Sequence, residues 1–211
     1  MKLQTDARSI AILAIFAAMI LALELIPVPF LTDIPLFAGF TLDPTGIPIT
    51  IVFLAFGSVF SLILIPIMWV AIAYRNPIGS VFKGFAEFYT LFGLIVAKLL
   101  LRNRSYDWKV SAPTFLAFGV AFRAIGMYIT NIFLIQWLYG SPLEGAIILS
   151  GAYVIPNIIQ ALINILIGVV VFIIIPENLA IQARFGKYGA HEYDKYEEIS
   201  ANELEPTGDD L

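Results

Sequence analysis

The chain has 211 residues, of which 60% are hydrophobic and only 13% are charged, and its mean hydropathy is +0.89. This composition provides too little polar surface to cover a water-soluble globule, so it excludes a soluble domain and indicates lipid as the solvent. The net charge of −4 is unevenly distributed, because residues 177–211 hold nine acids and three bases. We therefore expect a membrane-embedded domain over residues 1–176 and an acidic cytoplasmic tail, disordered or partly helical, over residues 177–211.

The absence of cysteine excludes disulfides, thiolate metal sites and cysteine nucleophiles. Lys2 to Arg8 precede the first apolar stretch, as the charged residues of a signal peptide would. No small-residue cleavage site precedes Glu24-Leu25-Ile26-Pro27, so we expect a retained first helix.

The first half of the chain predicts three helices separated by a broken stretch. An apolar helix over residues 10–26 is closed by prolines, and residues 27–46 are too rich in proline and glycine to span a membrane. Residues 47–74 are apolar but too numerous for one upright helix. We expect a break at Gly57-Ser58 that produces a short helix and a longer one.

The second half predicts spans at 79–101, 113–138 and 146–175, so the fold class is all-α, a polytopic membrane protein with six transmembrane helices, the second one short. An even number of spans places both termini on one side, and the positive-inside rule makes that side cytoplasmic. Nine of the twelve bases lie there: Lys2, Arg8, Lys98, Arg102, Arg104, Lys109, Arg184, Lys187 and Lys195. No internal repeat is evident, which weakens the case for a self-sufficient carrier.

A stripe of alanines runs along the first predicted helix at Ala7, Ala11, Ala14, Ala18 and Ala22. At about 100° per residue these positions share one helix face. Small residues allow close approach of helices in lipid. The stripe serves either internal packing or docking of another subunit, and the sequence favours neither.

Polar side chains at membrane depth form a second set: Arg123, Tyr128, Asn131, Asn157, Gln160 and Asn164. Asn157 and Gln160, three residues apart, share a helix face and could converge with Asn131 on an outward-facing cavity. Amides suit the edge of a planar heterocycle, because each offers a donor and an acceptor. For each amide alone, hydrogen bonding between helices, worth about 0.6 kcal/mol, is the stronger expectation. Of the aromatic residues near this depth, Trp69 is the preferred ligand contact because it lies within a span.

Intramembrane charges occur at Glu24, Glu87 and Arg123. Glu87 could pair with Lys83 within its helix or with Arg123 across helices, and a structural pair is favoured over a proton relay. If the pair were functional, it would couple an ion to a self-contained secondary transporter or channel.

Several motifs of enzymes and ATPases are absent. The sequence has no G-x-x-x-x-G-K-[ST] or G-x-S-x-G run, and its one histidine is His191 in the tail. We expect no catalytic residues, metal site, cofactor or nucleic-acid partner, and an embedded enzyme is disfavoured. Energy for any transport must come from a gradient or from partner subunits.

Four stretches of the sequence resemble motifs of one family of membrane proteins. Ala14-x-x-x-Ala18 resembles its small-residue docking motif. Residues 42–48, Leu-Asp-Pro-Thr-Gly-Ile-Pro, resemble the D-P-S-D-I-P entry to the second helix of riboflavin-type members, with Gly46 in place of the second aspartate. Met127 to Asn131 and Ile155 to Gln160 resemble that subgroup's fifth-span asparagine and sixth-span P-F-N-x-x-K pattern, with Gln160 in place of the lysine. The family that these stretches resemble is the substrate-specific S components of energy-coupling factor (ECF) transporters.

The resemblance implies a six-helix subunit that captures a water-soluble vitamin, with riboflavin or a related flavin as first candidate. It implies a transmembrane coupling protein and two cytoplasmic ATPases as partners, and a lid formed by residues 27–46. The alanine stripe, Ala14, Ala18 and Ala22 above all, would dock the coupling protein. The implied pocket residues are Leu42, Asp43, Trp69, Asn131, Asn157 and Gln160.

Overall fold

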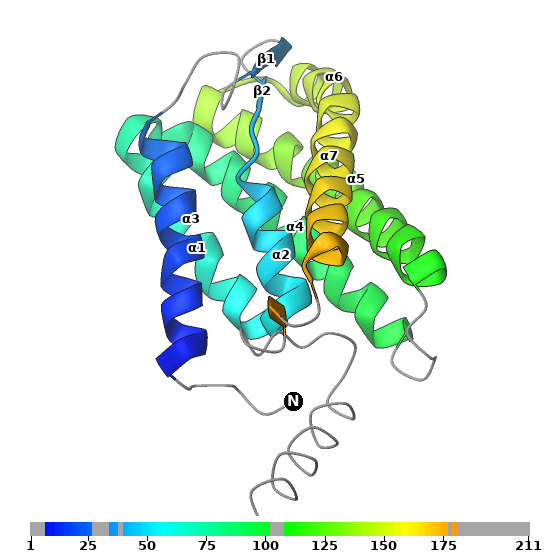
Figure 1. The fold of residues 1–211 in the computed structure, drawn as a ribbon. Coiled ribbons are helices and arrows are strands. Elements are labelled where there is room, and N and C mark those ends of the chain that lie inside the picture. The colour runs from blue at the N-terminus through cyan, green and yellow to red at the C-terminus, as the bar shows by residue number, and fades with distance from the viewer. Residues whose placement is uncertain (1–6, 27–33, 38–39, 102–107, 177–178, 181–211) are drawn as a thin grey trace, which may run out of the picture.

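The computed structural model describes residues 7–26, 34–37, 40–101, 108–176 and 179–180, and shows an all-α polytopic membrane protein (Figure 1). The helices are α1 (Ala7–Leu25), α2 (Gly46–Phe56), α3 (Ser58–Arg75), α4 (Pro77–Leu101), α5 (Trp108–Tyr139), α6 (Leu143–Ala152) and α7 (Val154–Ile174). Two short strands, β1 (Ile34–Phe37) and β2 (Phe40–Leu42), lie between α1 and α2. The predicted fold class is confirmed.

The apolar segments divide into long and short helices. Among the described residues, four segments are long and apolar enough to cross a membrane: Ser58–Arg75, Pro77–Leu101, Trp108–Tyr139 and Leu143–Ile174. The apolar part of α1, Ser9–Leu25, is slightly shorter, and α2 has 11 residues. At 1.5 Å per residue, α2 spans roughly half of the ~30 Å hydrocarbon core, as the predicted short second helix requires.

The chain turns between α2 and α3 at Gly57, as the sequence predicts. Gly57 has φ of 90°, and its amide donates to the Phe53 carbonyl at 3.0 Å. A positive φ of this kind favours glycine because it has no Cβ. The glycine therefore ends α2 while keeping α3 adjacent to it.

Two boundaries differ from the prediction. The segment expected as one helix over 146–175 bends at Tyr153 into α6 and α7, because Pro156, in the first turn of α7, has no amide hydrogen for the preceding turn. The helix expected over 113–138 begins at Trp108 and continues through Pro113. The Trp108 ring packs on Phe172 with centroids 6.0 Å apart, which stabilises the added turn.

A two-stranded ribbon occupies part of the stretch expected as an irregular lid. β1 and β2 pair antiparallel, with Ile34 opposite Leu42. Phe40 of β2 faces the Tyr153 ring at 6.3 Å, so the ribbon contacts the bend between α6 and α7. Residues 27–33 and 38–39 of the expected lid lie outside the described residues.

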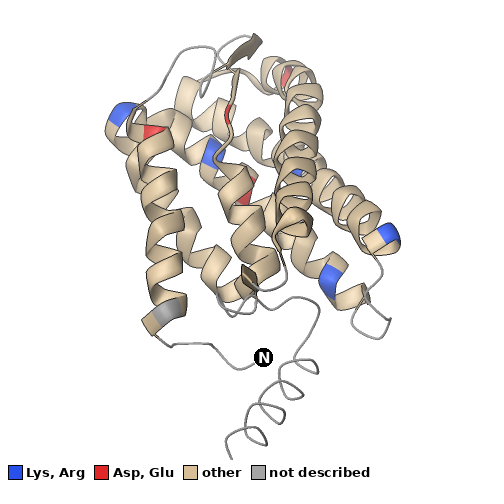
Figure 2. Ribbon diagram, viewed as in Figure 1, with Lys and Arg blue, Asp and Glu red and all other residues tan. Residues whose placement is uncertain are grey.

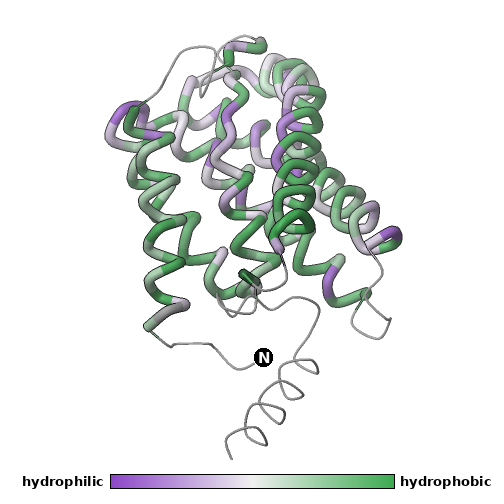
Figure 3. Tube along the Cα trace, in the orientation of Figure 1, coloured by the Kyte–Doolittle hydropathy of each residue, from purple (hydrophilic) through white to green (hydrophobic). Residues whose placement is uncertain are grey.

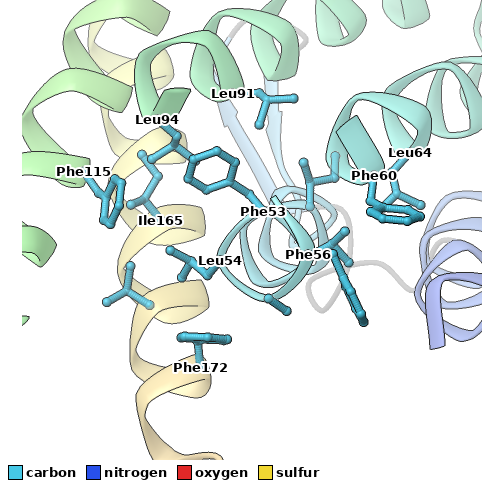
Figure 4. Packing of buried hydrophobic residues seen from close by; sticks show 14 of the residues in the cluster. Phe53, Leu54, Phe56, Phe60, Leu64, Leu91, Leu94, Phe115, Ile165 and Phe172 are labelled. Carbon is cyan, nitrogen blue, oxygen red and sulfur yellow. The ribbon is translucent and has the colours of Figure 1, made fainter. Parts of the chain in front are cut away.

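The apolar core centres on α2. Phe53 meets Phe115 of α5 edge to face at 6.0 Å, and Leu94, Ile165 and Phe172 surround it from α4 and α7 (Figure 4). Apolar residues continue over most of each helix (Figure 3), as a lipid environment requires.

Charged residues mark the two ends of the bundle. We call the end at which β1 and β2 lie the ribbon end, and basic residues also occur at the opposite end, where α4 finishes and α5 begins (Figure 2). Lys98 and Lys109, two of the bases predicted on the cytoplasmic side, belong to those helix ends. Lys2, Arg102, Arg104 and the tail bases lie outside the described residues, so the orientation stays a prediction.

Candidate ligand-binding site

The site begins at a turn that leads into α2. The Asp43 carboxylate accepts the Thr45 amide at 3.1 Å and also the Thr45 hydroxyl. Aspartate favours such turns because its short side chain reaches the backbone two residues on. The turn aims α2 into the bundle and leaves the Asp43 backbone facing α7.

Gln160 of α7 binds the Asp43 backbone with both ends of its side-chain amide. Gln160 Oε1 accepts the Asp43 amide at 3.2 Å, and Gln160 Nε2 donates to the Asp43 carbonyl. Gln160 is 1% exposed. These two hydrogen bonds satisfy both backbone groups of Asp43 and hold the segment between the ribbon and α2 against α7.

Four charged residues at this end form what we call the ion cluster: Glu24, Asp43, Arg75 and Lys83. Lys83 Nζ lies 2.7 Å from Asp43 Oδ1 and also pairs with Glu24 Oε1. Arg75 Nη2 lies 3.5 Å from Glu24 Oε2. Two acids and two bases balance, so the cluster carries no net formal charge.

The charge of Asp43 is stabilised in this setting. Burial alone raises the pKa of a carboxyl, but the Lys83 ammonium and the hydrogen bonds from Lys83 and Thr45 outweigh it. The pKa of Asp43 therefore lies below its ordinary value of 3.8.

A second polar group, the Arg123 network, lies deeper and consists of Glu87, Thr90, Arg123 and Asn157. Arg123 Nη1 donates to Glu87 Oε1 at 2.6 Å and to Thr90 Oγ1 at 3.2 Å, and Arg123 Nε donates to Asn157 Oδ1 at 3.2 Å. All four residues are buried. The structure selects Arg123 as the partner of Glu87, while Lys83 turns to Asp43 and Glu24 instead.

The start of α2 lies against Asn164 and against Glu87 of the Arg123 network. A Cβ on Gly46 would lie 2.1 Å from Asn164 Nδ2 and 2.8 Å from Glu87 Oε2. Only a residue without a side chain permits this approach. Gly46 therefore allows α2, α4 and α7 to meet at one point.

Some buried amide atoms here have no hydrogen-bond partner among the described residues. These atoms are Asn131 Oδ1 and both polar atoms of the Asn164 amide, and the two residues are at most 2% exposed. Leaving such a group unsatisfied costs about 1–3 kcal/mol. Buried groups of this kind call for a partner, such as water or a bound ligand.

Comparison with solved structures finds a similar arrangement of helices in another protein. The chain is similar to the "S-component for biotin from an ECF-type ABC transporter", with a TM-score of 0.52 and 18% sequence identity. The match covers 85% of this chain and 98% of that chain. The chain has the S-component fold. No family model and no curated protein matches the sequence.

Within this S-component fold, four of the predicted pocket residues occur together. Leu42 ends β2 next to Asp43, and Gln160 holds Asp43 one turn from Asn157. Asn131 lies on the buried face of α5, about two turns from Arg123.

Trp69 lies apart from these contacts. Its Nε1 donates to Ser80 Oγ at 3.0 Å, and its ring lies against Gly84, so it packs between α3 and α4. It is 40% exposed. The structure thus shows a packing role for Trp69 between two helices.

The predicted pocket left out four contributors: Lys83, Thr45, Gly46 and Asn164. The spacing of four residues between Lys83 and Glu87 fits one helix face, and it points only to a pair within α4. The two acids that Lys83 contacts come from α1 and from the turn before α2, and local spacing does not reveal such contacts. Gly46 carried a usable signal, since a glycine at the start of a helix can mark close backbone approach.

The alanine stripe faces away from the helix bundle. Ala7, Ala11, Ala14, Ala18 and Ala22 are all exposed. α1 packs on the core through its other face, with Ile20 fully buried and Leu13, Phe16 and Ala17 partly so. The alanines are therefore available to lipid or to a partner.

Proposed function

We propose that this chain is the substrate-binding membrane subunit of an ECF-type ABC transporter, which captures a water-soluble vitamin for uptake driven by partner ATPases. The observation that carries the proposal is the Asp43 turn, held by Gln160 and Lys83 above buried amides at one end of a bundle with the S-component fold. A solute captured there meets donors and acceptors before it meets the apolar core.

Riboflavin or a related flavin is the first candidate ligand and biotin the second. The flavin rests on the motifs at residues 42–48 and 155–160, and biotin on the likeness of the fold to an S component for biotin. Charge favours a neutral polar edge, because Arg75, Lys83 and Arg123 each contact a carboxylate of the chain. The carboxylate of biotin would have to compete with those acids, whereas the flavin ring would not.

The proposed pocket comprises Leu42, Asp43, Asn131, Asn157 and Gln160, together with Trp69, which packs between α3 and α4 and stays the predicted aromatic contact. Asp43 and Gln160 form its wall toward the ribbon, and the Asn131 oxygen, which has no partner within the described part of the chain, supplies an acceptor. The ribbon of β1 and β2 acts as the lid. Its Phe40 ring packs against the Tyr153 ring.

The exposed stripe of Ala14, Ala18 and Ala22 docks the transmembrane coupling subunit in this proposal. Alanine lets a partner helix approach closely, and close packing drives association in lipid. Both termini lie in the cytoplasm, where the two ATPase subunits work, and the ribbon end faces outward. Residues 1–176 form the membrane domain, and 177–211 the acidic tail.

One observation favours a second candidate, a self-contained secondary transporter or channel. The Glu87–Arg123 pair is buried at a depth where ionisable residues often serve ion pathways. In that case Glu87 and Arg123 would form the pair that couples an ion to transport.

A binding experiment tests the proposal. The purified protein is examined by visible absorbance for a co-purified flavin and then titrated separately with riboflavin and biotin. We expect one vitamin to bind and Gln160→Leu to weaken binding several-fold. Gln136→Leu is the matched control, because the Gln136 amide donates to the Ile132 carbonyl within its own helix, α5. A colourless protein that binds neither vitamin would contradict the proposal.

A further inference from the structure

Lys83 joins two parts of the chain that are far apart in sequence. Its ammonium contacts Glu24 on α1, 59 residues away, and Asp43 before α2. The side chains of Lys83, Glu24 and Asp43 are 16%, 4% and 10% exposed. Partly buried ion pairs of this kind are screened little by salt.

The contacts of Asp43 divide into local and distant ones. Thr45 binds its carboxylate within the turn, and Gln160 binds its backbone from α7. Of these three, Lys83 forms the ion pair to α1, through Glu24, and the Thr45 side chain also hydrogen-bonds to Glu24. A displacement of α1 relative to α4 therefore pulls on the ammonium that holds Asp43.

α1 carries both the alanine stripe and Glu24, one of the two acids that Lys83 contacts. Its exposed face bears the alanine stripe, and Glu24 lies two residues beyond Ala22 at the ribbon end. Elsewhere on α1, Ile20, Phe16 and Leu13 make apolar contacts that tolerate sliding better than an ion pair does. A shift of α1 is therefore transmitted from Glu24 through Lys83 to the position of Asp43.

We infer that Lys83 is a positioning residue that ties the ligand-capturing turn at Asp43 to α1 at Glu24, so that docking on α1 and occupancy of the site affect each other. The inference rests on the proposed function, because that function identifies the docked partner as the coupling subunit and the ligand as a vitamin. The contacts of Lys83 with Glu24 and Asp43 do not depend on it. Linkage requires the effect to be reciprocal, so a partner that shifts vitamin affinity is bound differently by the loaded protein.

The tether is tested first without ligand or partner. The chain has no cysteine, so Leu25→Cys on α1 and Thr41→Cys on β2 can carry a pair of spin labels at exposed positions. In the otherwise wild-type protein we expect a narrow distribution of the distance between the two labels. The distribution should be broader in Lys83→Met and narrow in Lys83→Arg. Lys98→Met is the matched control, because Lys98 lies on the same helix over the Phe53 ring. Equal distributions in all four proteins would overturn the tether.

The coupling is tested second, by riboflavin and biotin titrations of the protein alone and in complex with its coupling subunits. Wild type should change affinity on assembly, by about 5- to 150-fold for a typical coupled system. In Lys83→Met the ratio of the affinity in the complex to the affinity of the protein alone should fall toward one. In Lys83→Arg this ratio should return toward the wild-type value. An unchanged ratio in Lys83→Met would overturn the coupling.

If Lys83→Met does not fold, the double variant Glu24→Gln/Lys83→Met replaces it. Lys83→Met removes the cation from both Glu24 and Asp43, and Glu24→Gln removes one of these two acids as well. Failure of wild type to bind either vitamin would count against the proposed function, while the spin-label distances would still decide the tether.

Discussion

Arg123 Nη1 donates to Glu87 Oε1 at 2.6 Å, and the two side chains are only 3% and 2% exposed. A pair buried to this degree contributes little net stability, because desolvation offsets the attraction. Removing one partner is different, since it leaves the other charge without compensation.

Arg123→Met should therefore lower the free energy of unfolding by about 3–5 kcal/mol, measured by thermal or denaturant unfolding in detergent. The neutral double variant Glu87→Gln/Arg123→Met should recover most of that loss. If the double variant folds but no longer supports vitamin uptake, the pair has a functional role and the secondary-transporter alternative gains support.

Gly46→Ala should destabilise the protein by about 1–3 kcal/mol, because the new methyl group would overlap Asn164 and Glu87. Neither neighbour can yield easily, since Asn164 is fully buried and Glu87 is bound to Arg123. Gly151→Ala is the control: a Cβ there would meet nothing within 4 Å, so alanine should be neutral or stabilising. Equal melting temperatures for the two variants would contradict the proposed close approach.

The pH dependence of stability should contain a contribution from Asp43. Its pKa in the folded protein lies below the ordinary value of 3.8, so its stabilisation is fully present above that pH. The contribution is lost as the pH falls from about 3.8 through the folded-state pKa. Unfolding of wild type and Asp43→Asn, measured between about pH 7 and 3, should show the stability difference shrinking only at the acid end. A difference that stays constant over that whole range would show that the carboxylate charge is not stabilised.

Ala14→Trp/Ala18→Trp should abolish vitamin uptake while leaving vitamin binding by the isolated protein unchanged. The indole rings would prevent close approach of a partner helix, and both positions face away from the bundle. Ile125→Trp is the control, because Ile125 is 62% exposed on α5. Loss of binding in the alanine variant would indicate that the stripe serves internal packing.

Much of the fold could be predicted from the sequence because the strongest signals are local. Gly57 ends α2 where expected, and the pairing of Glu87 with Arg123 is one of the two pairings that the sequence allows. The bend at Tyr153 was missed because the segment is apolar throughout, although Pro156 marks it. The ribbon was missed because Pro35 is unusual in a strand and is tolerated here in a short two-stranded pair.

The candidate site was only partly predictable. Spacing on one helix places Asn157 and Gln160 together, but it does not reveal that Gln160 binds the backbone of Asp43. The same limit applies to Lys83, whose partners depend on how α1 and the turn before α2 pack against α4. The depth of Trp69 within a span favours a ligand contact, yet its described contacts lie between α3 and α4.

Reconstitution into liposomes tests the central claim most directly, by comparing the purified chain alone with the chain assembled with a coupling subunit and ATPases. We predict that the chain alone binds vitamin but does not accumulate it, and that accumulation appears only in the assembled complex with ATP. Accumulation by the chain alone, driven by an ion gradient and without any co-purifying ATPase, would contradict the claim.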